Sequence, residues 1–288
     1  MLKTRIITAC ILVAVFIPTL FMLSNISWAY CMLALSLLAL YEWGGMIKLN
    51  PLQKIIYLIV AAVAGLFALF LLRQHGFHFF FFKSLMLFAV VALFWLLIVP
   101  FWFKTKHVVK SKSILAVLGL LLIASLWLAL ICAKGADPWL LLILLITIWI
   151  ADSAAYFAGK NFGKHKLAPN ISPGKTWEGV LGALIAVSLF AAILYSIDLD
   201  GAHLAGTSLG SNFGFNQVAI FPLLWAVTCL GVAGDLFESL MKRHANLKDS
   251  SNLLPGHGGI LDRIDGIIPS LPIALLMIYV YHYFNSVT

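Results

Sequence analysis

The residues best suited to chemistry are concentrated near the C-terminal end of the chain. Asp235, Glu238 and Lys242 stand at i, i+3 and i+7, so they share one face of a predicted helix. Asp262 and Asp265 stand at i and i+3 on the polar side of the next predicted helix. Carboxylates beside cationic side chains suit a Mg²⁺–polyphosphate site, because Mg²⁺ takes one or two carboxylates together with phosphate oxygens.

The loop between these two predicted helices combines charge with irregular backbone. It begins with Lys248 and Asp249 and continues through the run Pro255-Gly256-His257-Gly258-Gly259. Glycines of this kind allow the backbone to approach a ligand closely. A solvated loop with surface salt bridges would account for the charges. It would not account for so many glycines and acids in a chain in which only 10% of the residues are charged.

Asp152 is a further candidate, because it lies within an apolar run at 138–158. An ionised carboxylate near hydrocarbon costs about 2.5–3.5 kcal/mol on insertion scales, so it needs a partner. Asp235 lies at matching depth in the run 217–237, which runs in the same direction across the membrane. We therefore expect both acids at the same membrane face, with a structural hydrogen bond of Asp152 to a neighbouring helix as the alternative.

The segment around Gly174, Lys175 and Thr176 resembles a P-loop only superficially. That motif requires a glycine five residues before Gly174, and the sequence has Pro169 there. A weaker prediction remains, in which backbone N–H groups at a helix N-terminus and nearby lysines bind an anion. Taken alone, this segment favours ordinary loop and anchor chemistry, whereas beside the charged segment 239–265 it favours phosphate binding.

The elements that must position these residues are strongly apolar. The chain of 288 residues is 62% hydrophobic, with a mean hydropathy of +1.03, whereas soluble domains are about a quarter charged. A membrane-spanning helix needs about 20 mostly apolar residues. The sequence therefore predicts an all-α integral membrane protein with about nine spans. They cover approximately 6–23, 26–43, 55–72, 85–103, 114–133, 138–158, 177–197, 217–237 and 267–284.

The distribution of basic residues predicts the orientation. With a cytoplasmic N-terminus, all but three of the 19 Lys and Arg residues fall on the cytoplasmic side, the exceptions being Arg73, Lys83 and Lys134. The C-terminus is then outside. The net charge of +8 is explained by this topology, and no basic stretch interleaved with aromatics argues for nucleic acid.

The chain divides by character into two predicted domains. Residues 1–135 have short loops and form about five spans, whereas residues 136–288 form about four spans. The second part carries cytoplasmic loops at 159–176 and 238–266 that are rich in Gly, Pro, Asp and Lys. We expect the chemistry in the second part, at the cytoplasmic face.

The segment from Ser239 to Asp265 resembles the signature of the bacterial phosphatidate cytidylyltransferases (CDP-diacylglycerol synthases). That signature reads S-x-hydrophobic-K-R-x4-K-D-x-small-x2-hydrophobic-P-x-H-G-G-hydrophobic-x-D-R-hydrophobic-D, and the segment matches it at every specified position. Asp152 and the run Ser172–Trp177 are also similar to bacterial members. The resemblance covers residues 136–288, while the first 135 residues match in character only.

The resemblance implies a reaction and a set of roles. CTP and phosphatidic acid would give CDP-diacylglycerol and pyrophosphate at the inner (plasma) membrane of a bacterium, in a multi-pass protein whose active site faces the cytoplasm. It implies Mg²⁺, with a second cation such as K⁺ as a candidate, and a homodimer as a candidate assembly. Asp235 and Asp262 would hold the metal, with Asp152 as a further candidate. The catalytic set is completed by Lys248, Asp249, Arg263 and Asp265, and the substrate-binding set is Ser172, Lys175, Ser239, Lys242, Arg243, His257, Gly258 and Gly259.

Three other functions share some of these features. A CDP-alcohol phosphotransferase has a D-x-x-D-G motif like Asp262–Gly266, but its motif continues with A-R where this chain has Ile267-Ile268. A CTP-dependent polyprenol or lipid kinase would share much of the chemistry, although the signature fits the cytidylyltransferases better. A membrane transporter would place charges at mid-membrane in paired broken helices, whereas these acids cluster at one face.

Overall fold

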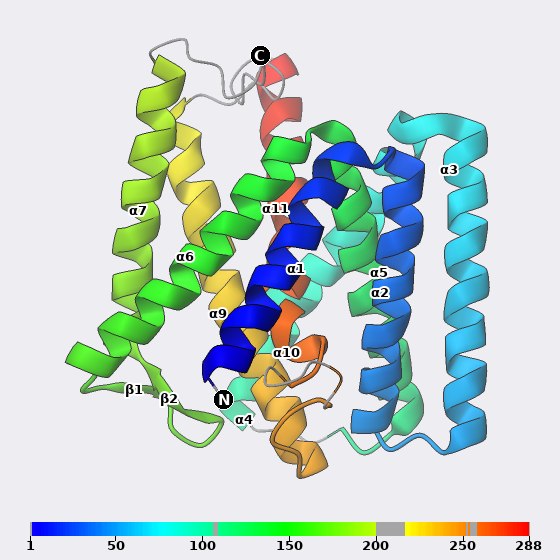
Figure 1. Cartoon of the computed structure of the whole chain (residues 1–288), viewed down its shortest axis with the longest axis horizontal. Coiled ribbons are helices and arrows are strands. Elements are labelled where there is room, and N and C mark those ends of the chain that lie inside the picture. The colour runs from blue at the N-terminus through cyan, green and yellow to red at the C-terminus, as the bar shows by residue number, and fades with distance from the viewer. Residues whose placement is uncertain (1, 106–108, 200–216, 252, 254–257, 288) are drawn as a thin grey trace.

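A computed structural model describes residues 2–105, 109–199, 217–251, 253 and 258–287 (Figure 1). The described elements are mostly helices. They are α1 (Leu2–Met22), α2 (Asn25–Met46), α3 (Pro51–Leu93), a π-helical turn (Phe94–Ile98), α4 (Val99–Thr105), α5 (Lys112–Ala136), α6 (Pro138–Phe162), α7 (Trp177–Leu199), a 3-10 turn (Gln217–Ala219), α9 (Ile220–Ala245), α10 (Leu261–Ile264) and α11 (Ile267–Val287). Strands β1 (Lys166–Ala168) and β2 (Ser172–Thr176) form one antiparallel hairpin.

The predicted all-α membrane fold is confirmed. Within the described ranges, eight helical segments are long and apolar enough to cross a membrane. They correspond to the second through ninth predicted spans. The first predicted span corresponds to α1. Among the described residues, its apolar segment Val13–Met22 is shorter than these eight. Large apolar side chains of α3, such as Ile59, Val63 and Phe67, are exposed on the outside of the bundle, as expected for contact with lipid.

Local sequence sets where the helices begin. Ser24 and Ser111 accept hydrogen bonds from backbone N–H groups in the first turns of α2 and α5. Asn50 and Gln53 form a reciprocal capping box at the start of α3. Asp137 ends α5 and caps α6, and Pro138 follows it at the first helical position. The tight α5–α6 connection therefore follows from a single Asp-Pro pair.

The third and fourth predicted spans form one continuous element with a sharp break. The backbone of α3 is helical except at Gly76, where φ is +78°. A residue with a Cβ rarely adopts this conformation, so glycine allows the chain to turn without a loop. The first arm, Pro51–Phe77, then lies along one side of the bundle, while the second, Phe79–Thr105, returns through the bundle to α4 at its lower end (Figure 1).

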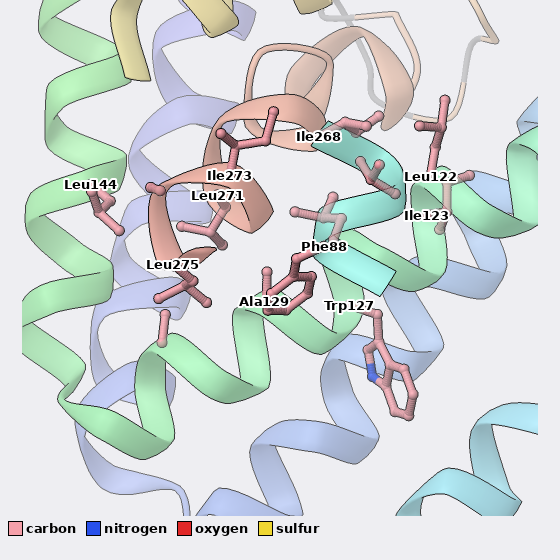
Figure 2. Close-up of a cluster of buried hydrophobic side chains, with 14 of the residues drawn as sticks. Phe88, Leu122, Ile123, Trp127, Ala129, Leu144, Ile268, Leu271, Ile273 and Leu275 are labelled. Carbon is pink, nitrogen blue, oxygen red and sulfur yellow. The ribbon is translucent and has the colours of Figure 1, made fainter. Parts of the chain in front are cut away.

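The buried core joins the two predicted domains. Helix α11 lies in the middle of the bundle, where Leu271 and Leu275 contribute to the same apolar cluster as Phe88, Leu122 and Leu144 from α3, α5 and α6 (Figure 2). All five side chains are almost fully buried. The last span is thus packed against helices from both sides of the predicted boundary at residue 135. The division into two domains stays a prediction.

The candidate residues gather at one end of the bundle. The β1–β2 hairpin, α10, the C-terminal end of α9 and the start of α1 all lie at the lower end of Figure 1, while α11 ends at the upper end. The hairpin replaces part of the plain loop predicted at 159–176. The opposite ends for α1 and α11 agree with an odd number of crossings. Which end faces the cytoplasm stays a prediction.

Candidate active site

A polar cavity of about 720 Å³ opens at the end of the bundle where the hairpin lies. Its walls come from α6, the hairpin, α7, α9 and the segment around α10. A volume in the range of about 300–1,000 Å³ is typical of small-molecule sites. The charged residues that line it are Asp152, Lys160, Lys166, Lys175, Asp235, Lys242, Asp249, Asp262, Arg263 and Asp265.

The hairpin places Lys175 against α9. Trp177 N donates to His165 O, which closes the hairpin at the start of α7. His165 Nδ1 also lies 2.6 Å from Glu178 Oε1. Lys175 Nζ then lies 2.5 Å from Asp235 Oδ2. Since both side chains are only partly exposed, their mutual neutralisation is screened less than it would be on an open surface.

A second lysine neutralises the acids at the C-terminal end of α9. Lys242 Nζ lies 2.5 Å from Glu238 Oε2, one helical turn earlier, and 2.6 Å from Asp262 Oδ1. The ammonium group is mostly buried, as are both carboxylates. This contact joins α9 to α10 across the signature segment.

The second oxygen of Asp262 organises the loop before α10. Asp262 Oδ2 accepts hydrogen bonds from Ser250 N at 3.0 Å and from Gly259 N at 2.8 Å. It also lies 3.0 Å from Ser250 Oγ, whose single proton it shares with Glu42 of α2. Gly258 has φ of +81°, and a Cβ there would lie 2.6 Å from the same oxygen. Glycine at this position therefore allows the loop to close around the carboxylate.

Three further carboxylates line the polar cavity from different elements. Asp152 from α6, Asp235 from α9 and Asp265 after α10 lie close enough for their charges to interact, and Lys175 acts on all three. Within the described part of the chain, the Asp152 carboxylate has no hydrogen-bond partner. Like charges this close repel one another unless cations or protons compensate.

Close backbone packing brings Asp265 to Asp235. A Cβ on Gly234 would lie 2.9 Å from Pro269 Cγ and still closer to the carbonyl oxygen of Asp265. Helix α9 can approach the start of α11 only because position 234 has no side chain. The residue next to this glycine is Asp235, so the close crossing holds the two carboxylates at the same level.

A second, mostly apolar cavity of about 450 Å³ lies against the same residues. Its apolar walls include Phe16 from α1, Met32 and Leu35 from α2, and Trp149 from α6. Asp152, Asp262, Arg263 and Asp265 line both this cavity and the polar one. The two cavities therefore meet at one group of charged side chains.

Comparison with known proteins assigns the family. The profile of the cytidylyltransferase family matches residues 3–281 of this chain. The chain belongs to the cytidylyltransferase family. It is 33% identical to a phosphatidate cytidylyltransferase of Haemophilus influenzae over 289 residues, which cover 94% of this chain and 96% of that protein. It is 35% identical to a phosphatidate cytidylyltransferase of Pseudomonas aeruginosa over 290 residues, 97% of each chain.

Most of the predicted site residues of this cytidylyltransferase come together. The predicted meeting of Asp152 and Asp235 at one end of the bundle is observed. Other predicted residues that line the polar cavity are Ser172, Lys175, Lys242, Asp249, Asp262, Arg263 and Asp265. Ser239 lies behind it and donates to Asp235 Oδ1 at 3.3 Å. The roles assigned to all of these residues stay predictions.

Besides Ser239, four predicted residues lie outside the lining of the polar cavity among the residues that the structure describes. Arg243 and Lys248 are exposed. Gly258 and Gly259 shape the loop around Asp262. His257 is outside the described residues, so its predicted role is untouched by the structure.

The cytidylyltransferase site also contains residues that the sequence did not single out. Lys160 and Lys166 line the polar cavity. Glu42 on α2 accepts hydrogen bonds from the signature loop. The sequence could have pointed to Glu42, because it is the only Asp or Glu among residues 1–135. A lone acid inside a predicted span is expensive and implies a partner.

Proposed function

We propose that this chain transfers the cytidylyl group of CTP to phosphatidic acid. A phosphatidate oxygen attacks the α-phosphorus of CTP, a new P–O bond forms, and the bond from the α-phosphorus to the bridging oxygen breaks. The products are CDP-diacylglycerol and pyrophosphate, which carries away the electron pair of the broken bond. The whole-length similarity to phosphatidate cytidylyltransferases supports this function.

The meeting of the two cavities is the observation that carries the proposal. A triphosphate needs a polar, hydrated cavity with cations, and the larger cavity offers Lys160, Lys166 and Lys175. A glycerolipid needs apolar walls, and the second cavity offers α1, α2 and α6 side chains. Arg263 lines both, so it can contact the reacting phosphates of both substrates.

The side chains of this protein act mainly by charge and position. The chemistry of such a displacement depends on holding the nucleophile in line and on neutralising charge at the phosphates. Lys175 and Lys242 are held by Asp235 and Asp262. An incoming triphosphate competes for both ammonium groups, because charge-assisted bonds to phosphate are of similar strength. Asp235 and Asp262 would then release their lysines to the nucleotide.

The donor set fits Mg²⁺. The cavity brings together carboxylate oxygens, which Mg²⁺ prefers. Within the described residues, no three acidic, His or Cys side chains stand in a ready-made metal cage. Mg²⁺ usually uses one or two carboxylates with phosphate oxygens, so a preformed cage is not required. Asp235 and Asp262 would hold the ion, with Asp152 as a further candidate and K⁺ as a candidate second cation. Bound Mg²⁺ would neutralise charge on the phosphates.

The choice of acceptor tests the proposal. Purified protein would be incubated with CTP, Mg²⁺ and one lipid at a time: phosphatidic acid, diacylglycerol or a polyprenol. We expect a CDP-lipid by thin-layer chromatography, with stoichiometric pyrophosphate, only with phosphatidic acid. Phosphorylation of diacylglycerol or a polyprenol would instead support a lipid kinase, and no product with any acceptor would contradict an enzymatic function.

The proposal extends to the location and orientation of the protein in the cell. We place the protein in the bacterial inner membrane with the polar cavity open to the cytoplasm, where CTP is available. The basic residues gathered around this cavity support that orientation. A homodimer is also proposed, and light scattering of the purified protein would test it.

A further inference from the structure

A buried carboxylate from the N-terminal half reaches the signature loop. Glu42 lies near the C-terminal end of α2 and is 2% exposed. A buried carboxylate is costly unless hydrogen bonds or charges compensate it. Its position in the first 135 residues, where no other Asp or Glu occurs, makes its partners informative.

Among the residues that the structure describes, the hydrogen bonds accepted by the Glu42 carboxylate come from Ser250, Ser251, Ile260 and Leu261. Oε1 accepts from Ser251 Oγ at 2.5 Å and from Ile260 N at 2.9 Å. Oε2 accepts from Leu261 N at 2.8 Å and lies 3.0 Å from Ser250 Oγ, whose single proton is shared with Asp262. A carboxylate offers about four lone-pair sites, and three of these accept undivided hydrogen bonds while the fourth shares the Ser250 proton. The packing is tight, since a Cβ on Gly259 would lie within 2.7 Å of both oxygens.

The same loop is held from its other side by Asp262. Ser250 Oγ lies 3.0 Å from an oxygen of Glu42 and 3.0 Å from Asp262 Oδ2. Gly259 N donates to Asp262, while the next two backbone N–H groups donate to Glu42. The loop is therefore clamped between two carboxylates, one from α2 and one that lines both cavities.

We propose that Glu42 is a positioning residue for the active site. It holds the chain at Ser250 and Ser251 and at Ile260 and Leu261, and thereby the place of Asp262 and Arg263 between the two cavities. This inference rests on the proposed function, because it assigns Glu42 to the site that receives CTP. It also gives the N-terminal helices a part in the reaction, although Glu42 itself lines neither cavity.

The test separates positioning from simple stability. Glu42→Gln keeps the size of the side chain, but its NH₂ group faces N–H and O–H donors. The variant loses hydrogen bonds to a charged group, so we expect the Kd for CTP with Mg²⁺ to rise about tenfold or more. This Kd would be measured by calorimetry on the full-length protein without phosphatidate. We expect kcat to fall by at least as much at a temperature where the protein is folded. Glu42→Asp, which keeps the charge, should recover part of both losses.

The matched control is Trp43→Phe, on the same helix. Trp43 Nε1 donates to Leu115 O at 2.8 Å, so this change loosens α2 from α5 without touching the loop. We expect it to lower the melting temperature while the Kd for CTP stays unchanged. Equal effects of Glu42→Gln and Trp43→Phe on the Kd, or an unchanged Kd in Glu42→Gln, would overturn the proposal.

A milder variant covers the case in which Glu42→Gln does not fold. Ser251→Ala removes one donor to Glu42, and we expect the Kd for CTP to rise about threefold to tenfold. An unchanged Kd would again overturn the proposal. Failure of the proposed function would look different, because the wild-type protein would then bind no CTP or form no CDP-lipid.

Discussion

At the scale of the residue, the site is organised as lysine–carboxylate pairs. Lys175 neutralises Asp235, and Lys242 neutralises Asp262 together with Glu238. The two aspartates differ in what else they hold. Asp262 also accepts two backbone hydrogen bonds from the loop before α10 and shares the Ser250 hydroxyl with Glu42, whereas Asp235 accepts one hydrogen bond from Ser239. We therefore expect Asp262 to stabilise the loop as well as to take part in the chemistry, and Asp235 to act mainly in the chemistry.

Replacing either aspartate should abolish most of the activity, with different effects on stability. Asp235→Asn and Asp262→Asn keep the size and lose the charge, so we expect kcat to fall about 100-fold or more in each. Asp262→Asn should also lower the melting temperature, since its loop loses a charged acceptor, while Asp235→Asn should not. Activity near wild type in either variant, in protein that inserts and purifies normally, would remove that residue as a metal ligand.

Arg263 should matter more than any lysine far from the cavities. Loss of a charge-assisted partner for a phosphate predicts that Arg263→Gln lowers kcat/KM about tenfold to 100-fold. Lys248→Gln should act in the same direction but less, because Lys248 is exposed and does not line the polar cavity. Steady-state assays with CTP and phosphatidate varied in turn would measure both.

The control changes Lys104, Lys106, Lys110 and Lys112 together to Gln. As anchors to the anionic leaflet each is worth about 1 kcal/mol, so this variant should keep most of its activity provided that the topology survives. A large loss of activity in the quadruple variant, together with a small loss in Arg263→Gln, would contradict the proposed site and indicate that the substrates bind near loop 104–113.

At the scale of the element, the crossing of α9 and α11 sets the site. Gly234 lets α9 approach the carbonyl oxygen of Asp265 and the ring of Pro269. The hairpin adds Lys175, and the α10 segment adds Asp262 and Arg263. Each element brings a small number of charged groups, so a displacement of one helix would change the whole constellation.

Gly234→Ala should push α9 away from α11. The added methyl group would meet backbone, which cannot turn aside as a flexible side chain does. We expect overpacking to cost about 1–3 kcal/mol, seen as a lower melting temperature, together with a fall in kcat. Gly45→Ala in α2 is the control, because its Cβ would meet only Lys54 Nζ, at 3.4 Å. Equal stability and activity of Gly234→Ala and Gly45→Ala would refute the close crossing.

The spans and the meeting of Asp152 with Asp235 could be predicted because they depend on local patterns. Apolar runs mark helices, and acids at matching depths in two helices of the same direction must reach the same end. The β-hairpin at 166–176 could not be predicted in this way, since Pro173 and Gly174 give it no alternating apolar pattern. The contact of Lys175 with Asp235 depends on how that hairpin folds, so it too required the structure.

At the scale of the whole molecule, the N-terminal and C-terminal halves share one core and one site. Leu271 and Leu275 of α11 pack with Phe88 of α3 and Leu122 of α5 (Figure 2). Glu42 of α2 holds the signature loop. The helices of the first half could be predicted from sequence patterns, but their contacts with the second half could not. The contact of Glu42 with Leu261, for example, depends on tertiary packing between residues 219 positions apart.

The orientation of the bundle gives a prediction at this scale. Because nearly all basic residues lie on one side of the predicted spans, a reporter fused to the C-terminus should be outside the cytoplasm, and one inserted in loop 104–113 should be inside. Alkaline phosphatase and fluorescent protein fusions would read the two sides. A cytoplasmic C-terminus would mean that α1 does not cross the membrane or that another span was miscounted.

The central claim is that the α-phosphorus of CTP, with its cytidine, is transferred to phosphatidate. The most direct measurement uses purified protein, phosphatidate and Mg²⁺ with CTP labelled at either the α- or the γ-phosphorus. We predict that the α-label appears in the lipid fraction and the γ-label in pyrophosphate. Appearance of the γ-label in the lipid, with CDP released, would show a kinase and contradict the account.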